Sequence, residues 1–270
     1  MKTRIVTGVL AGAVFLGFLL WGGPAYGALL TLMAVIGYDE YIRMNGIGRK
    51  KPEALIGFAG VLCLLLFSFQ EWSDRSAVDW VIGHPERLVW LLLFLFFAVT
   101  VLSKNKTTID QIALLFLGVF YIGIGFRYMM ETRSGADGLY WTLFVFLCIW
   151  ASDAGAYFVG RMLGKHKLWP EISPNKTIEG AVGGIVITMI VAICFHFGRP
   201  ELLDIGRAIS LGIIISIVGM LGDLMQSAYK RVKGIKDTGT LLPGHGGILD
   251  RTDSWLIVFP FLQLLSLLPQ

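Results

Sequence analysis

Cysteine and histidine are scarce in this chain of 270 residues, which has three cysteines and four histidines. Cys63, Cys148 and Cys194 all lie in apolar stretches, without CxxC spacing and without a nearby histidine cluster. This pattern excludes a zinc site and a disulfide framework, because both require a characteristic spacing of cysteines or histidines. We therefore interpret the three cysteines as packing residues.

Charge is also scarce, since 16% of the residues are charged and 55% are hydrophobic. Soluble domains have about 25% charged residues, so this composition excludes one. A membrane-spanning helix needs about 20 mostly apolar residues, and the chain has nine such runs. We therefore expect an all-α polytopic integral membrane protein with about nine transmembrane helices. They lie at about 4–21, 25–44, 54–70, 87–103, 110–130, 138–160, 177–197, 206–229 and 251–268.

Basic residues gather on one side of these predicted helices. With a cytoplasmic amino terminus, seventeen of the 23 Lys and Arg residues fall in cytoplasmic connections. Such a bias indicates that the amino terminus is cytoplasmic and, with nine crossings, that the carboxyl terminus is outside. Topology thus explains the net charge of +4, and we expect no nucleic-acid partner. The small residues near Ala28 also resemble a signal-peptide cleavage region, but eight further apolar runs favour a retained first helix.

Polar side chains are distributed unevenly along the chain. Residues 1–135, with about five predicted helices, have little chemistry beyond Asp39 and Glu40, and we predict that they form a transmembrane scaffold. Residues 136–270, with about four predicted helices, contain both long polar stretches. We predict that this second half is the catalytic region, with its polar loops in the cytoplasm.

The densest polar stretch runs from Ser227 to Ser254, where basic residues precede a Gly-His-Gly-Gly sequence and an acidic cluster. Mg²⁺ prefers carboxylate oxygens and commonly shares its ligands with substrate phosphates. Asp223 and Asp250 supply carboxylates, and glycines allow the backbone to approach a ligand closely. On a helix, Asp223, Ser227 and Lys230 share one face. The stretch therefore predicts a site for a metal and a triphosphate.

A second polar stretch runs from Trp150 to Gly180. In a helix, Asp153, Tyr157 and Arg161 share one face, and glycines at 155, 160 and 164 allow close packing against another helix. After a turn at Ser173 and Pro174, Thr177 is a candidate N-cap with Glu179 in the first helical turn. A helix amino terminus beside Lys176 also suits a phosphate, and both interpretations can hold together.

Several of these residues have a structural alternative. A carboxylate within a membrane helix costs free energy. Asp153 and Asp223 could therefore each form an interhelical pair with an arginine, or simply lie close to the membrane interface. Asp250 could be an N-cap with Asp253 at the third helical position. If Asp223 and Asp250 meet, their like charges require a bound cation or a raised pKa.

Together these residues resemble the signature of the phosphatidate cytidylyltransferase family, also called CDP-diacylglycerol synthases. The downstream pattern is matched at Ser227, Lys230, Arg231, Lys236, Asp237, Gly239, Leu242, Pro243, His245, Gly246, Gly247, Ile248, Asp250, Arg251 and Asp253. The upstream pattern is matched at Asp153, Tyr157, Gly160, Arg161, Gly164, Lys165, Ser173, Pro174, Lys176, Thr177, Glu179 and Gly180. Tyr229 departs from the usual aliphatic residue or phenylalanine. The resemblance covers roughly 150–254.

The resemblance implies a Mg²⁺-dependent reaction in which CTP and phosphatidic acid give CDP-diacylglycerol and pyrophosphate. A second metal or a monovalent cation is left open. It implies Asp223 and Asp250 as metal ligands and catalytic residues, with Lys230, Arg231 and His245 also catalytic. Substrate and phosphate binding would fall to Asp153, Arg161, Ser173, Lys176, Thr177, Glu179, Ser227, Lys236, Asp237, Gly246, Gly247, Arg251 and Asp253.

The expected partners are CTP, phosphatidic acid and membrane lipids, and a homodimer is left open. We expect a multi-pass protein of the cell's inner membrane with its active site facing the cytoplasm, where CTP arrives. The lipid phosphate is largely dianionic at neutral pH, since its second pKa is about 6. It needs alignment and charge neutralisation rather than a strong base. His245 would bind phosphate or protonate the leaving group, or else only mark a turn.

Two other functions remain as alternatives. A CTP-dependent lipid kinase would use similar metal and phosphate groups, but it would transfer the γ-phosphate to the lipid. A cation-coupled transporter would use Asp153 and Asp223 as ion sites. The charges, however, cluster at one membrane face and the sequence has no evident inverted repeat.

Overall fold

The computed structural model of the chain describes residues 2–66, 85–241, 244 and 246–269. It divides into two compact units. Unit 1 comprises Met1–Glu131 and Asp237–Asp250, and unit 2 comprises Thr132–Lys236 and Arg251–Gln270. The predicted site residue His245 and its signature neighbours Leu242 and Pro243 lie outside the described residues.

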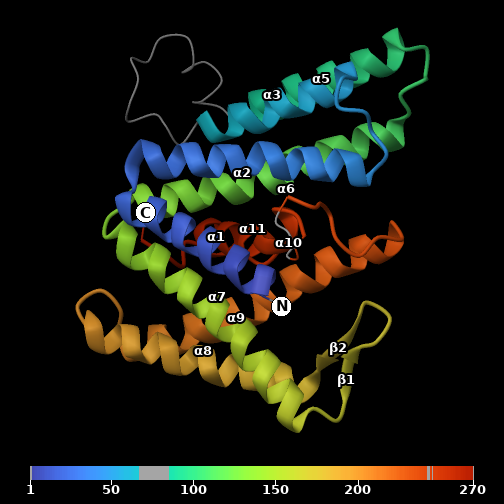
Figure 1. Cartoon of the computed structure of the whole chain (residues 1–270). Coiled ribbons are helices and arrows are strands. Elements are labelled where there is room, and N and C mark those ends of the chain that lie inside the picture. The colour runs from blue at the N-terminus through green and yellow to red at the C-terminus, as the bar shows by residue number, and fades with distance from the viewer. Residues whose placement is uncertain (1, 67–84, 242–243, 245, 270) are drawn as a thin grey trace. The chain divides into compact units, whose positions relative to one another are not determined.

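Unit 1 consists of long helices and the segment 237–250 (Figure 1). Its helices are α1 (Lys2–Trp21), α2 (Gly23–Met44), α3 (Pro52–Leu66), α5 (Pro85–Leu102) and all but the end of α6 (Ile109–Ser134). Gly22 and Gly23, both with positive φ, make the tight connection between α1 and α2. Glycine also allows α6 to pack closely on α2, because a Cβ at Gly118 of α6 would collide with the ring of Tyr41 of α2. The Tyr41 hydroxyl donates to the Leu114 carbonyl at 3.0 Å.

Unit 2 is built on three long helices, α7 (Gly138–Leu163), α8 (Ile178–Gly198) and α9 (Ile205–Val232). A two-stranded antiparallel hairpin of β1 (Lys167–Trp169) and β2 (Ser173–Thr177) joins α7 to α8, and Figure 1 shows it extending past the helix ends. The short helix α10 (Leu249–Thr252) crosses the boundary between the units, and α11 (Trp255–Leu264) packs on α9 and α7.

The predicted close packing by glycine is confirmed between α7 and α8. A Cβ at Gly155 would lie 2.9 Å from the Ile187 side chain, and one at Gly160 would lie 3.5 Å from the Gly180 Cα. Gly164, which ends α7, lies against Thr177. The glycines therefore let the two helix backbones approach closely.

Each of the nine predicted runs overlaps a described helix, and the first eight agree within a few residues where the chain is described. The last prediction, one helix over 251–268, is wrong. A turn at Asp253 and Ser254 separates α10 from α11, which has ten residues and contains Pro260. The hairpin also differs from the prediction, which placed only a turn at Ser173 and Pro174.

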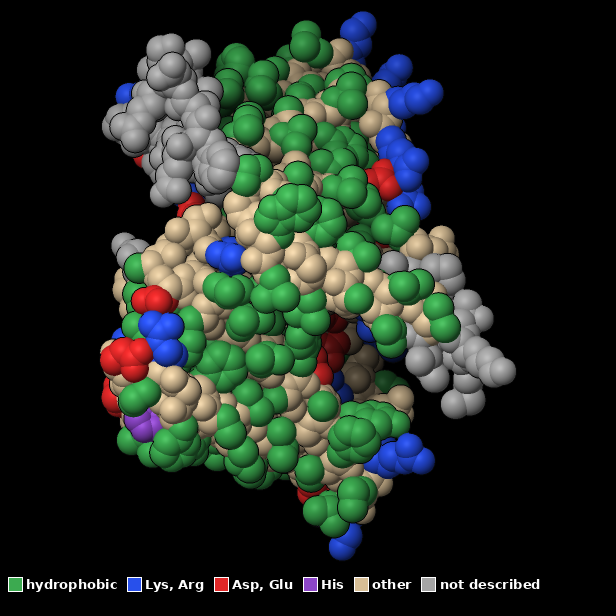
Figure 2. Space-filling view, turned by 60° about the vertical axis from the view of Figure 1, so that its left-hand side comes forward, with side chains coloured by type: hydrophobic (Ala, Val, Ile, Leu, Met, Phe, Trp, Pro, Cys, Tyr) green, Lys and Arg blue, Asp and Glu red, His purple; other side chains and the backbone are tan. Residues whose placement is uncertain are grey.

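Among the described residues, four helices are long and apolar enough to cross a membrane: α6, α7, α8 and α9. Shorter apolar helices are found in α1, α3 and α11. Large apolar side chains such as Trp21, Trp90 and Phe197 are mostly exposed. Figure 2 shows hydrophobic side chains over much of the visible surface. Exposed apolar surface of this extent is typical of a protein embedded in a membrane.

Candidate active site

In unit 2 the carboxyl-terminal part of α9 brings an acid, a hydroxyl and an ammonium together. Lys176 of β2 places its Nζ 2.6 Å from Oδ2 of Asp223, and the Ser227 hydroxyl donates to Oδ1 of Asp223 at 3.3 Å. The side chains of Lys176 and Asp223 are 25% and 32% exposed, respectively. The predicted helical face is therefore confirmed for Asp223 and Ser227. Among the described residues, the alternative of an interhelical pair with an arginine is not found for Asp223, whose ion-pair partner is Lys176 of strand β2.

Two further carboxylates lie within electrostatic range of Asp223, namely Asp153 on α7 and Asp253 in the turn before α11. Burial, reinforced by the charges of Asp223 and Asp153, raises the pKa of Asp253 to about 7. Lys176 and Arg251 lie within electrostatic range of Asp153, and Lys230 lies within electrostatic range of Asp253. Unit 2 thus gathers three acids and three bases, an arrangement suited to a cation beside phosphates.

The hairpin of unit 2 is anchored at both ends. Thr177 caps α8 by accepting a hydrogen bond from the Gly180 N–H at 3.1 Å, which confirms the predicted N-cap. Glu179, in the first turn of α8 as expected, accepts from the N–H groups of Lys165 and His166 and from the His166 ring. These contacts hold β2, and with it Lys176, against the start of α8.

Two arginines predicted to take part in the site have protein partners. Arg161 donates to the Tyr157 hydroxyl at 3.2 Å, so these two residues share a face of α7 as predicted. Arg231 donates through Nε to the Ile172 carbonyl in the hairpin turn at 3.3 Å. Ser173 lies in β2, and Lys236 and Arg251 are exposed. The roles predicted for all of them remain predictions.

In unit 1 the Asp250 carboxylate binds two described residues that precede it, Thr238 and Gly247. Oδ2 of Asp250 accepts from the N–H groups of Thr238 at 2.8 Å and Gly247 at 2.9 Å, and from the Thr238 hydroxyl at 3.0 Å. Asp250 lies inside α10 and binds residues that precede it, so the predicted N-cap role is wrong. The reason is that α10 begins at Leu249, one residue earlier.

The glycines of this segment have a steric explanation. Gly246 has φ +83° and faces the Asp250 carboxylate, and a Cβ at Gly247 would collide with the carboxylate of Glu40. Asp237 is exposed at the start of the segment. The phosphate-binding roles predicted for Gly246, Gly247 and Asp237 remain predictions.

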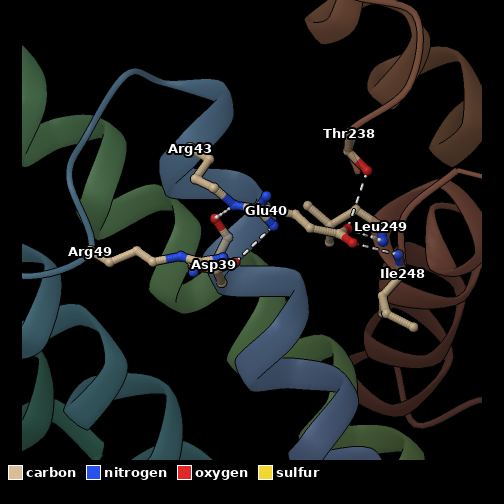
Figure 3. Close-up of polar contacts among 7 residues, drawn as sticks. All are labelled: Asp39, Glu40, Arg43, Arg49, Thr238, Ile248 and Leu249. Atoms are coloured by element: carbon tan, nitrogen blue, oxygen red, sulfur yellow. Dashed lines mark hydrogen bonds and ion pairs between the residues drawn. The ribbon is translucent and has the colours of Figure 1, made fainter. Parts of the chain in front are cut away.

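Sequence reasoning did not include Glu40 and Thr238 in the site. Glu40, at the end of α2, is 1% exposed and accepts hydrogen bonds from this segment (Figure 3). The sequence signal for Glu40 was an acid near the end of an apolar helix. The signal for Thr238 was its position between the signature residues Asp237 and Gly239. Neither residue could be connected to the other by spacing, because they are 198 positions apart.

The two predicted metal ligands belong to different units, with Asp223 in unit 2 and Asp250 in unit 1. Within the part of the chain that the structure describes, no group of three or more His, Cys, Asp or Glu side chains is arranged to hold a metal. Mg²⁺ often needs only one or two carboxylates, because substrate phosphates and water complete its octahedral shell. The carboxylates of unit 2 fit that mode of binding.

Known proteins resemble the chain over nearly its whole length. Residues 2–268 match the family described as the cytidylyltransferase family. A phosphatidate cytidylyltransferase of Staphylococcus haemolyticus is 43% identical over 265 residues, which are 98% of each chain. The proteins of the same name from Staphylococcus saprophyticus and Staphylococcus aureus are 41% and 40% identical over the same share of each chain.

Proposed function

The chain belongs to the cytidylyltransferase family, and from this premise we propose how its own residues carry out the transfer. It is a nucleotidyltransferase of phospholipid biosynthesis that makes CDP-diacylglycerol and pyrophosphate from CTP and phosphatidic acid. An oxygen of the lipid phosphate forms a bond to the α-phosphorus of CTP, and the bond from that phosphorus to the bridging oxygen of pyrophosphate breaks.

Repulsion between two polyanions is the main obstacle to this reaction. We propose that the basic residues of unit 2 neutralise this repulsion. Lys176 and Arg251 lie within electrostatic range of Asp153, and Lys230 lies within range of Asp253. Lys176 carries the proposal furthest, because its ammonium is 2.6 Å from Asp223 and is held by the anchored strand β2. A fixed cation stabilises charge that develops on phosphate oxygens at no cost of reorganisation.

Asp223 and Asp250 are the residues that would hold Mg²⁺. When bound, the metal would neutralise phosphate charge and polarise the α-phosphoryl group. The Asp223 carboxylate stays oriented by Ser227 and Lys176, whereas Asp250 is held by the N–H groups of Thr238 and Gly247. A second metal or a monovalent cation is compatible with the additional carboxylates of unit 2.

The chain is a membrane-embedded protein, and its finer topology is part of the proposal. We propose about nine crossings, a cytoplasmic amino terminus, residence in the cell's inner membrane and an active site that faces the cytoplasm. The concentration of Lys and Arg on one side supports this orientation. CTP would then arrive from the cytoplasm, while phosphatidic acid enters laterally from its leaflet. A homodimer stays open.

The test uses purified protein, phosphatidic acid, Mg²⁺ and CTP labelled at the α-phosphate. We expect label in a chloroform-soluble product with the native protein and about a 100-fold lower rate with Asp250→Asn, because a metal ligand contributes several kcal/mol to charge stabilisation. The asparagine oxygen can still accept from Thr238 and Gly247, so the segment should remain folded. Asp110→Asn, an exposed acid in the first turn of α6, is the matched control and should keep its rate.

Full activity of Asp250→Asn at the same Mg²⁺ requirement would reject Asp250 as a metal ligand. Label that reached the lipid from γ-labelled CTP instead would indicate a kinase. Addition of EDTA should abolish the transfer, and excess Mg²⁺ should restore it.

A further inference from the structure

Glu40 is a buried acid that the transfer chemistry described above does not use. It lies near the carboxyl-terminal end of α2, in the half of the chain predicted to be scaffold, and is 1% exposed. Its neighbour Asp39 has a different environment, since it pairs with Arg43 and Arg49 at the protein surface. Figure 3 shows the two acids pointing apart, with Asp39 toward the arginines and Glu40 toward the segment that contains Thr238 and Ile248.

The Glu40 carboxylate binds the backbone of the signature segment. Oε1 accepts from the Ile248 N–H at 2.9 Å, and Oε2 accepts from the Leu249 N–H at 3.0 Å and the Thr238 hydroxyl at 3.2 Å. Two consecutive N–H groups bound by one carboxylate fix the backbone where Gly247 leads into α10. Glu40 therefore determines the path of the chain immediately before Asp250.

Thr238 links Glu40 to Asp250. Its hydroxyl is 3.2 Å from Oε2 of Glu40 and 3.0 Å from Oδ2 of Asp250. A hydroxyl has one proton to donate, so the two carboxylates share this donor. A change at Glu40 must consequently alter the hydrogen bonding of Asp250.

The glycines of the segment are consistent with this role. A Cβ at Gly239 would lie 2.5 Å from Oε1 of Glu40, and one at Gly247 would collide with both carboxylate oxygens. Glycine at 239 and 247 thus lets the backbone close around Glu40. This explains two glycines of the signature without any ligand.

A buried carboxylate is a weak source of stability, because its desolvation offsets much of what its partners return. An apolar pair of the same volume would often stabilise a protein as well. What the hydrogen-bonded carboxylate supplies is a defined backbone geometry. That property matters where a following side chain must be aligned for a reaction.

We propose that Glu40 is a positioning residue for cytidylyl transfer, which orients the backbone at Ile248 and Leu249 and the Thr238 hydroxyl, and thereby the carboxylate of Asp250. This inference rests on the proposed role of Asp250 as a metal ligand. Glu40 acts through the N–H groups of Ile248 and Leu249 and through the Thr238 hydroxyl.

The test compares Glu40→Gln with Asp39→Asn, the adjacent acid that faces the arginines. The amide of Glu40→Gln presents an NH₂ group to one backbone N–H donor, so the segment loses part of its anchor. We expect kcat to fall about 10- to 100-fold, because small misplacements of reacting groups have effects of this size. The KM values for CTP and phosphatidic acid should stay within about threefold, and Asp39→Asn should keep native kinetics.

A double-mutant cycle separates positioning from general destabilisation. Thr238→Val removes the shared donor and should itself lower kcat. The double variant with Glu40→Gln should lose less than the product of the two single losses, since both act on one network. Asp39→Asn combined with Thr238→Val should show multiplied effects. Thr238→Val also serves as the second variant if Glu40→Gln does not fold.

Two results would overturn the proposal: native kcat per folded molecule in Glu40→Gln, or multiplied effects in its double variant. A lower melting temperature with unchanged kcat would assign Glu40 a structural role only. The parallel Asp250→Asn assay distinguishes the two levels of inference. If Asp250→Asn is inactive and Glu40→Gln is native, the positioning role alone fails. If Asp250→Asn is active, the proposed role of Asp250 as a metal ligand fails.

Discussion

The Asp223 carboxylate has two side-chain partners, a neutral hydroxyl and a charged ammonium. The Ser227 hydroxyl is one helical turn away on α9 and orients Oδ1, whereas the Lys176 ammonium comes from β2 and neutralises Oδ2. An ion pair this exposed contributes little to stability. Its position among the acids of unit 2 favours a role with charged substrates.

Replacement of Lys176 tests that role. Lys176→Met keeps the length of the apolar stem and removes the ammonium, so phosphate loses a charged donor. Hydrogen bonds to charged groups contribute about 1.5–3 kcal/mol, so we expect kcat/KM for CTP to fall about 10- to 100-fold. Steady-state kinetics with varied CTP measure this, and Lys167→Met, an exposed lysine of β1, is the control. Unchanged kcat/KM in Lys176→Met would exclude phosphate binding by this side chain.

The pair of helices α7 and α8 determines where the hairpin residues can lie. Gly180 of α8 lies against the backbone of α7, since a Cβ there would be 2.7 Å from the Ala156 carbonyl oxygen and 3.2 Å from the Gly160 Cα. Backbone atoms cannot move aside as a flexible side chain can. Close helix contact therefore depends on glycine at 180.

We expect Gly180→Ala to lower the free energy of unfolding by about 1–3 kcal/mol, as overpacking commonly does. Gly198→Ala lies on the same helix, where an added Cβ meets no heavy atom within 4 Å, and it should match the native protein. Thermal unfolding in detergent compares the two variants. Equal melting temperatures would show that α8 shifts without cost.

The whole protein is mostly helical, with polar connections between apolar helices. Among the described helices, α6, α7, α8 and α9 are both long and apolar enough to cross a membrane. Lys106, between α5 and α6, and Glu201, between α8 and α9, are both exposed. In the proposed topology these two connections lie on opposite sides of the membrane.

Cysteine labelling tests the topology in a variant whose Cys63, Cys148 and Cys194 are replaced by alanine. We expect an impermeant maleimide to label Lys106→Cys only in inside-out vesicles and Glu201→Cys only in right-side-out vesicles, because Lys and Arg gather in cytoplasmic connections. The reverse pattern would place the amino terminus outside. Labelling of both positions from one side would reject the proposed number of crossings between them.

Helices were predictable from local pattern because apolar runs of spanning length have few alternatives in a membrane. The Thr177 cap and the close packing of Gly155 and Gly160 were also predictable, because their partners are one helical turn away or on the next helix. The break at Asp253 was not, because the apolar composition continues across it. Nor was the hairpin, whose strands have three and five residues.

The types of chemical group in the site could be predicted from the residues of the signature, which indicated carboxylates, cations and close backbone approach. The residues that these groups contact in the folded chain could not be predicted from it. Lys176 meets Asp223 across 47 positions of chain, and Glu40 meets Leu249 across 209. Sequence spacing predicts contacts within a helix, where geometry repeats, but contacts at such separations arise only when the chain folds back on itself. The folded chain therefore supplied Glu40, and with it a physical reason for the glycines at 239 and 247.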